Sequence, residues 1–258
     1  SLGRTKLIFD GDVIVISGAT SGLGKNAALR FAEAGARVVF GGRRESEGVK
    51  VADEITRNGG SCRFVRCDVT RSDDVVMLID TAVAEFGQLN MAYNVAGIPG
   101  DAFSKFADYD ETEWRQTIDV NLNGMFYCMK YEIAAMLKSG GGTIVNMSSV
   151  AGLGATPGGA AYVASKHAII GLTKTAALDY AQNNIRVNAI APGVVRTEMM
   201  EWGITQTPDL EAQMVAHQPI GRLGTMDEVT NAAIWLCSKN ASFVTGATLS
   251  VDGAYLLN

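Results

Sequence analysis

Short apolar runs alternate with longer segments of helical spacing along the whole chain. The first run, Asp12 to Ser17, is rich in Val and Ile, as expected of a buried parallel strand. A glycine-rich turn follows, and apolar residues then recur at helical spacing from Leu23 to Ala32, before Gly35 stops the helix. The chain therefore opens as a strand, a turn and a helix.

The same alternation continues to the C-terminal end. Ser72 is expected to cap one of the later helices, and Gly87 to close it. Strands that alternate with helices imply βαβ crossovers, so the predicted fold class is α/β: a single doubly wound parallel sheet of the Rossmann type, with helices on both faces. The further strands are predicted over residues 37–40, 62–66, 89–94, 143–148, 185–191 and 248–251, and the further helices over 45–58, 72–86, 111–138, 160–181 and 226–238.

Composition fits one large domain and argues against several classes of function. The chain has 258 residues, of which 47% are hydrophobic, and no linker rich in Pro, Ser or Gly, so residues 1–258 are expected to form one domain. Its net charge of −5, without a block of like charges, argues against nucleic acid or a membrane as partner. No transmembrane run or secretory signal is evident, so we expect a cytoplasmic protein.

The cysteines and histidines do not form a metal-binding pattern. Cys62, Cys67, Cys128 and Cys237 lack metal-ligand spacing and fall within predicted strands and helices, so we expect reduced thiols. With only two histidines in the chain, we expect no metal site.

The turn after the first strand has the composition of a phosphate-binding loop. Gly18, Gly22 and Gly24 let the backbone approach a pyrophosphate, and Ser21 and Leu23 lie among them at the start of the helix. The helix N-terminus adds free N–H groups and the positive end of the helix dipole. In this setting the glycines predict a dinucleotide site, with a bare tight turn as the alternative.

The spacing Gly-x-x-x-Gly-x-Gly resembles the cofactor turn of the short-chain dehydrogenase/reductase family, in its single-domain branch. The family's motifs follow in order from residue 12 to about residue 253. Ser17 stands where the family usually has Thr, which keeps the hydroxyl and loses the methyl group, and Ala254 replaces a usual Gly. The resemblance implies a nicotinamide dinucleotide as cofactor.

The end of the second strand favours NADP(H), with NAD(H) as the alternative. A carboxylate at this place would bind the adenosine ribose hydroxyls and select NAD. This chain has Gly42 there instead, followed by Arg43 and Arg44. A guanidinium can hold a 2′-phosphate through two donors at once, so Arg43 is predicted to contact it.

Other strand ends match the family's cofactor contacts. By resemblance, Asp68 accepts a hydrogen bond from the adenine amino group and the Val69 backbone supports it, although Asp68 could instead cap a turn. Asn94, Ala96 and Gly97 carry over from the segment that ends the fourth strand, where an apolar residue replaces the family's second Asn.

A later loop matches the family's Pro-Gly segment. By resemblance, the backbone near Val195 and the side chain of Thr197 meet the nicotinamide carboxamide. Thr197 would thereby orient the ring face that transfers hydride.

Tyr162 and Lys166 form the most specific chemical signal in the chain. They stand one helical turn apart on one helix face. A free tyrosine is a poor base at neutral pH because its pKa is about 10. The Lys166 ammonium, with the positive ring of the oxidised cofactor, is expected to favour the phenolate and lower the pKa of Tyr162. Both residues are also expected to contact the cofactor.

Ser149 and Asn121 complete the catalytic set implied by the resemblance. Ser149 follows a strand and can donate to a carbonyl oxygen; Ser148 competes, but the family's spacing to the tyrosine favours Ser149. Asn121 matches an asparagine that keeps a helix distortion and holds a water beside Lys166, with Asn123 as its rival.

The set predicts hydride transfer between the nicotinamide and a ketone or secondary alcohol, with Tyr162 as general acid/base. A dinucleotide-binding sensor or scaffold of the same fold is the alternative. An enoyl reductase is disfavoured, since those relatives usually space Tyr and Lys more widely.

The substrate end is less well specified. Residues 198–216 carry large apolar side chains and are interpreted as a lid over a small or medium hydrophobic ketone or secondary alcohol, with bends at Gly203 and Pro208. Their alternative role is in the core or at a subunit contact. By resemblance only, the helices around 111–138 and 160–181 pair between subunits, so a homotetramer is expected.

Overall fold

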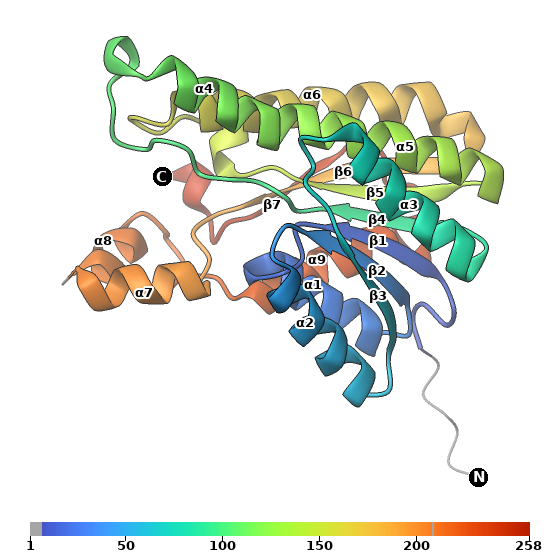
Figure 1. The fold of residues 1–258 in the computed structure, drawn as a ribbon. Helices are drawn as coiled ribbons and strands as arrows, with labels where there is room; N and C mark the ends of the chain where they lie inside the picture. The colour runs from blue at the N-terminus through green and yellow to red at the C-terminus, as the bar shows by residue number, and fades with distance from the viewer. Residues whose placement is uncertain (1–6, 208) are drawn as a thin grey trace.

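A parallel seven-stranded sheet forms the centre of the molecule (Figure 1). The computed structural model describes residues 7–207 and 209–258. The strand order is β3-β2-β1-β4-β5-β6-β7, and every neighbouring pair is parallel. The predicted doubly wound α/β fold is therefore confirmed. The strands are β1 (Val13–Ser17), β2 (Arg37–Gly42), β3 (Ser61–Arg66), β4 (Met91–Asn94), β5 (Gly142–Met147), β6 (Ile185–Pro192) and β7 (Thr248–Val251).

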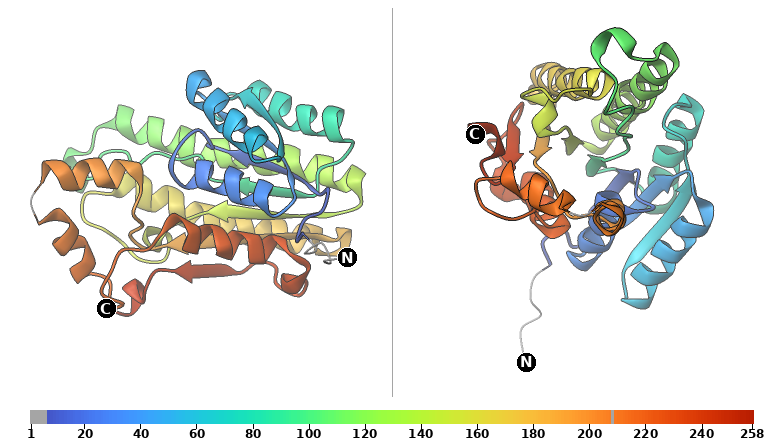
Figure 2. Two further views of the ribbon diagram at one scale, coloured as in Figure 1. Left: turned by 90° about the horizontal axis from the view of Figure 1, so that it is seen from below. Right: turned by 90° about the vertical axis from the view of Figure 1, so that its left-hand side faces the viewer.

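Helices cover both faces of this sheet (Figures 1 and 2). One face carries α1 (Gly22–Glu33), α2 (Glu45–Arg57) and α9 (Met226–Cys237). The other carries α3 (Ser72–Phe86), α4 (Glu111–Ile118), α5 (Gly124–Ser139) and α6 (Ala160–Tyr180). Short helices are η1 (Phe106–Asp108), η2 (Asp119–Asn123), η3 (Val150–Gly152), η4 (Ala181–Asn183), η5 (Lys239–Ala241) and η6 (Tyr255–Leu257).

The two cores follow from the alternation of side chains along each strand. In β1, Ile14 and Ile16 pack with α1 and α9, whereas Val13 and Val15 pack with α3, α5 and α6. All four side chains are buried, which explains why the strand is an unbroken apolar run.

The order of the strands reverses at β1, which lies between β2 and β4. In open α/β sheets, ligands bind beyond the carboxyl ends of the strands at such a switch point. At this edge Ser17, Asn94 and Asn146 share one register across β1, β4 and β5. The sheet thus directs the glycine turn, the segment after β4 and the segment after β5 to one place.

The predicted helix over 111–138 is divided into three parts. Between α4 and α5 the segment η2 is a π-helical turn, so the distortion expected near Asn121 is present.

Three local predictions change. Ser72 is the first residue of α3 and Arg71 occupies the cap position in extended conformation, without a side-chain cap bond, so the Ser72 cap was wrong by one residue. Gly203 lies within α7 (Glu198–Gln206), so it does not divide the segment into two elements. Cys67 lies just after β3 rather than within a strand, and all four cysteines are free thiols.

The segment predicted as a lid forms two helices that project from the body at one end (Figure 1). α7 is followed by α8 (Leu210–Ala216), and Arg196 pairs with Glu201 of α7 and Glu211 of α8. This shared guanidinium ties the two helices together at their base. The predicted bend at Pro208 and the side chains of Met199 and Trp202 lie outside the described residues.

Candidate active site

A groove of about 930 Å³ runs along the carboxyl edge of the sheet at the switch point. Most of the predicted cofactor contacts line it: Gly18, Ser21, Gly22, Leu23, Gly24, Arg43, Asp68, Val69, Ala96, Gly97 and Thr197. Residues that the sequence motifs do not assign to the cofactor also line it, among them Thr20, Arg44, Ile98 and Val120. The sequence does not show that Ile98 and Val120 line the groove, because this depends on the tertiary contact between the segment after β4 and η2.

The glycine turn is shaped by close backbone contacts. A Cβ atom on Gly18 would lie 2.6 Å from the Ala96 Cα atom, and one on Gly24 would lie 2.1 Å from the Gly18 carbonyl oxygen. Gly18 also has a positive φ of 70°. Side chains at these positions would push the turn away from β4 and from α1.

The start of α1 is open toward the groove. Ser21 is the cap residue, but its side chain makes no capping hydrogen bond with the first turn. The first amides of a helix carry partial positive charge and lack intrahelical partners. Together with the glycine cradle, these amides fit the pyrophosphate of a dinucleotide.

The end of β2 presents two arginines, and the position before them is Gly42 instead of a carboxylate. Arg44 donates to the hydroxyls of Thr20 and Ser21, and Arg43 lines the groove beside it. A Cβ atom on Gly42 would lie 2.5 Å from the Thr20 Cγ2 atom, so the turn itself blocks a side chain there.

Asp68 lines the groove and also stabilises a turn. Its Oδ1 atom accepts from the Thr70 amide at 3.0 Å and from the Thr70 hydroxyl at 2.8 Å. Burial raises the pKa of Asp68, but these bonds and the charges of Arg43 and Arg71 outweigh it and leave the pKa below its usual value. The carboxylate is therefore charged, and both interpretations of Asp68 fit the geometry.

Asn94 has its side-chain hydrogen bonds inside the protein. Its side chain is 1% exposed and does not line the groove. Instead its amide donates to Glu132 at 2.9 Å and to Asn146 at 3.1 Å. The structure thus gives the Asn94 side chain a role inside the sheet, and its contact with the cofactor stays a prediction.

The Pro-Gly segment after β6 is anchored on both sides. Val195 is buried and pairs with Gly224 in a parallel bridge. Its side chain faces a second cavity of about 290 Å³ rather than the groove. Thr197 lines the groove, and its hydroxyl accepts from the Met200 amide at the start of α7.

Tyr162 and Lys166 lie on one face of α6, and neither of them, nor Ser149 or Asn121, is among the residues that line the groove. The Lys166 Nζ atom is 5.4 Å from the centre of the Tyr162 ring and donates to the Met147 carbonyl oxygen at 3.0 Å. A Cβ atom on Gly97 would lie 3.6 Å from Nζ, which places Lys166 against the groove lining.

Burial dominates the pKa values of Tyr162 and Lys166. Burial raises the pKa of Tyr162, and a hydrogen bond with Ser149 lowers it only in part. Burial also lowers the pKa of Lys166 to about 8. Loss of water thus disfavours the charged form of both groups, and the lowering of the Tyr162 pKa by Lys166 together with the oxidised nicotinamide ring stays a prediction.

The two serines after β5 have different surroundings. The Ser148 hydroxyl donates to the Lys166 carbonyl oxygen at 2.9 Å, which fixes α6 to the sheet. The Ser149 hydroxyl lies close enough to Tyr162 to lower the pKa of the phenol, and it accepts from the Ala151 amide at 3.1 Å. Ser149 is thus the serine that shares a site with Tyr162.

Asn121 rather than Asn123 faces this site. Its amide bonds both the N–H and the C=O of Ile98, at 2.8 and 2.9 Å, and donates to Ser165 at 3.2 Å. Asn123 is on the surface, bonded to Asp119. Asn121 therefore links η2, α6 and the segment after β4.

The described part of the chain has neither a membrane-spanning helix nor a metal-binding cluster. No helix there is both long and apolar enough to cross a membrane. Within the same residues, no cluster of His, Cys, Asp and Glu side chains is arranged to hold a metal ion.

Comparison with known proteins agrees with this geometry. The family model described as enoyl-(acyl carrier protein) reductase matches residues 18–255. A-factor type gamma-butyrolactone 1′-reductase of Streptomyces virginiae is 44% identical, and the match covers 95% of each chain. Cyclohexanol dehydrogenase of Acinetobacter sp. strain SE19 is 42% identical, with 96% of each chain covered.

A solved structure shares the whole fold. The 7α-hydroxysteroid dehydrogenase complexed with NADH and 7-oxo glycochenodeoxycholic acid superposes with a TM-score of 0.90 at 35% identity, covering 98% of this chain and 97% of that one. The chain therefore belongs to the short-chain dehydrogenase/reductase family and is an NAD(P)-dependent oxidoreductase.

Proposed function

We propose that this chain interconverts a ketone and a secondary alcohol on a small alicyclic compound, with Tyr162 as general acid/base and NADP(H) as the preferred cofactor. The observation that carries the proposal is the grouping of Lys166 and Ser149 around Tyr162, with Lys166 directly behind Gly97 in the lining of a groove that fits a dinucleotide.

The chemistry assigns a separate task to each side chain. The bound nicotinamide supplies the hydride donor or acceptor. Ser149 donates a hydrogen bond to the substrate oxygen, and Tyr162 gives that oxygen its proton during reduction or removes it during oxidation. The raised pKa of Tyr162 keeps the phenol protonated at neutral pH, which suits the reductive direction.

Lys166 and Asn121 support this proton transfer. One donor of the Lys166 ammonium is used by the Met147 carbonyl, and the group has further donors for the ribose hydroxyls of the cofactor. Asn121 holds the segment at Ile98 and the π-helical turn in place beside Lys166. Its proposed contribution is to keep a route from the amine to solvent.

The preference for NADP(H) is supported by the end of β2. Arg43 and Arg44 supply positive charge where a 2′-phosphate would lie, and Thr20 occupies the space that a side chain at position 42 would need. The hydroxysteroid dehydrogenase carries NADH on the same fold, so the fold alone does not choose the cofactor.

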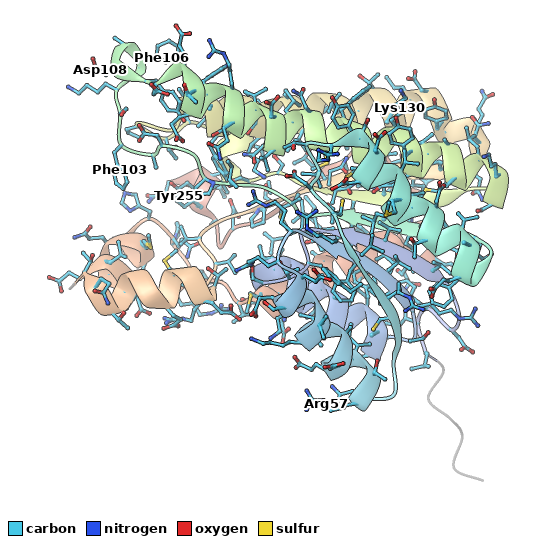
Figure 3. All side chains as sticks on the ribbon, in the orientation of Figure 1. Arg57, Phe103, Phe106, Asp108, Lys130 and Tyr255 are labelled. Atoms are coloured by element: carbon cyan, nitrogen blue, oxygen red, sulfur yellow. The ribbon has the colours of Figure 1, made fainter. Side chains whose placement is uncertain are left out.

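The substrate class rests on the open end of the site. Met200, Ile204 and Met214 of α7 and α8 are half-buried, and Phe103, which is 94% exposed, lies with Tyr255 at the same end of the molecule (Figure 3). These apolar groups suit a hydrocarbon ring, and α7 with α8 would close over it. The compared proteins are named for a butyrolactone, a cyclohexanol and a steroid, which are all ring compounds.

A homotetramer in the cytoplasm completes the proposal. The layer formed by α4, α5 and α6 has exposed apolar side chains that a subunit contact would cover: Trp114, Phe126, Leu137 and Leu178. Light scattering that gives a monomer at micromolar concentration would contradict this part.

A panel of substrates tests the proposed activity. Cyclohexanone, cyclohexanol and an unsaturated acyl thioester are each incubated with NADPH or NADP⁺, and in parallel with NADH or NAD⁺, while nicotinamide absorbance is followed. We expect turnover of the ketone and the alcohol, with the phosphorylated cofactor favoured. Turnover of the thioester alone would replace the proposal by an enoyl reductase, and cofactor binding without any turnover would favour a sensor.

A further inference from the structure

A row of buried polar side chains crosses the sheet directly below the groove. The Ser17 hydroxyl donates to the Asn94 Oδ1 atom at 3.4 Å, and the Asn94 amide donates to Asn146 at 3.1 Å. Asn146 in turn donates to Thr173 of α6 at 3.0 Å. We call Ser17, Asn94 and Asn146 the polar ladder, because they share one register on three neighbouring strands.

The ladder reaches the groove through Ser17. The backbone amides of Val95 and Ala96 both donate to the Ser17 hydroxyl oxygen, at 3.3 and 3.4 Å. Val95 and Ala96 line the groove, and Ala96 is the residue that Gly18 approaches most closely. A shift of the Ser17 hydroxyl would therefore move the wall of the groove and the glycine turn together.

Glu132 of α5 holds the other end of the ladder. Its carboxyl group is fully buried, and its Oε2 atom accepts from the Asn94 amide at 2.9 Å. The carboxyl oxygen of Glu132 accepts from the Asn94 nitrogen, and the Asn94 oxygen accepts from Ser17, so these two bonds together fix the orientation of the Asn94 amide. The Ser17 hydroxyl then donates to Asn94 and keeps its lone pairs for the two amides.

Burying a carboxyl group without a charged partner lowers the free energy of unfolding, so we expect a contact through which Glu132 acts. Oε1 of Glu132 has no hydrogen-bond partner among the described residues. No charged side chain of the described residues contributes to its pKa, which burial raises to about 8. The titratable group beside it on α5, the Cys128 thiol, has its pKa raised by burial and stays neutral. Glu132 therefore has no ion-pair partner within the described part of the chain and acts through Asn94.

We propose that Glu132 is a positioning residue for cofactor binding, which sets the groove wall at Val95 and Ala96 through Asn94 and Ser17. This inference rests on the proposed function only in taking the groove as the cofactor site. Glu132 touches neither the groove nor the reacting groups.

The test measures cofactor affinity and turnover separately in the full-length protein. Dissociation constants for NADPH come from fluorescence titration, and kcat comes from turnover of cyclohexanone at saturating NADPH. The variants are Glu132→Leu, which removes the acceptor, Glu132→Gln, which keeps an acceptor oxygen, and Ser17→Ala, which removes the other end of the chain of bonds. Asn188→Ala is the matched control, because Asn188 is a buried amide whose bonds go to residues 244 and 247.

We expect Glu132→Leu and Ser17→Ala each to raise the dissociation constant about tenfold, the effect of one lost buried hydrogen bond, with kcat largely unchanged. Glu132→Gln should stay within about twofold of the parent, and the double variant Ser17→Ala/Glu132→Leu should lose no more than Ser17→Ala alone. Asn188→Ala should lose thermal stability without a change in affinity.

Other outcomes overturn the inference. Unchanged affinity in folded Glu132→Leu, or independent losses that add in the double variant, would show that Glu132 does not act through Ser17. If Glu132→Leu does not fold, unchanged affinity in Ser17→Ala, or a tenfold loss in Glu132→Gln, would overturn it equally. Failure of the parent protein to bind either dinucleotide would instead refute the proposed function, and the inference with it.

Discussion

Two adjacent serines after β5 have different roles, because one contributes to the packing of α6 and the other lies at the proposed catalytic site. Ser148 and Ser149 have the same functional group, but neighbouring residues at a strand end point in opposite directions. Ser148 turns into the protein and donates to the Lys166 carbonyl oxygen, whereas Ser149 lies beside Tyr162 and lowers the pKa of the phenol. Under the proposed function, only the Ser149 hydroxyl meets the substrate oxygen.

Removing each hydroxyl should therefore have a different effect. Ser149→Ala should lower kcat by about 100-fold, as expected when one donor to a developing oxyanion is lost. Ser148→Ala should lower the free energy of unfolding by about 1 kcal/mol and leave kcat within a few-fold of the parent. Steady-state kinetics and urea denaturation of both variants check this, and a larger loss of kcat in Ser148→Ala would reverse the assignment.

At the scale of elements, the glycine turn and the end of β2 are interlocked. Thr20 of the turn fills the space beside Gly42, and Arg44 reaches back to Thr20 and Ser21. The choice of cofactor thus depends on two segments that are distant in the sequence. A carboxylate that selects NAD cannot enter at position 42 while Thr20 keeps its side chain.

Cofactor exchange should therefore need two substitutions. Gly42→Asp alone should weaken NADPH binding by at least about tenfold without a matching gain for NADH, because its Cβ atom collides with Thr20. Thr20→Ala/Gly42→Asp should bind NADH better than NADPH, and Thr20→Ala alone should keep the parent's preference. Titration of all three variants with both cofactors decides, and tight NADH binding by Gly42→Asp alone would contradict the interlock.

Elements and local motifs could be predicted from the sequence, but the partners of buried polar groups could not. The glycine turn, Arg43 and the Tyr162–Lys166 pair depend on short spacings, which a sequence displays directly. Asn94 looked like a cofactor contact because its motif ends a strand. Its true neighbours, Asn146 and Glu132, follow from strand register and from the face that α5 presents, which spacing does not give.

For the whole molecule, buried ionisable groups make stability depend on pH. Burial raises the pKa of Glu132 from 4.5 to about 8. Below pH 4.5, the ordinary pKa of the carboxyl group, Glu132 is protonated in both the folded and the unfolded chain. As pH rises from there to about 8, the unfolded chain releases the proton and the folded chain keeps it, so this group's contribution to stability is progressively lost. Above pH about 8 Glu132 is ionised in both states, so the loss in the free energy of unfolding no longer changes with pH.

The free energy of unfolding should therefore decrease with rising pH in the parent protein, and this pH dependence should be absent in Glu132→Gln. Each pKa unit corresponds to about 1.4 kcal/mol, so the parent should lose a few kcal/mol relative to Glu132→Gln across this window. Lys166 does not interfere, because it is charged in both states below its folded pKa of about 8. Urea denaturation of both proteins between the two pKa values provides the measurement, and equal slopes would mean that Glu132 is ionised in the folded state.

The most direct test of the proposed chemistry is removal of the phenol oxygen at position 162. Tyr162→Phe takes one oxygen from a ring that keeps its place on α6, so NADPH should bind with the parent's affinity. Single-turnover reduction of cyclohexanone should fall by at least about 100-fold, because the variant lacks the phenol that is proposed to transfer the proton to the substrate oxygen. Retention of the parent's single-turnover rate in a variant that binds NADPH normally would contradict the assignment of Tyr162 as the acid.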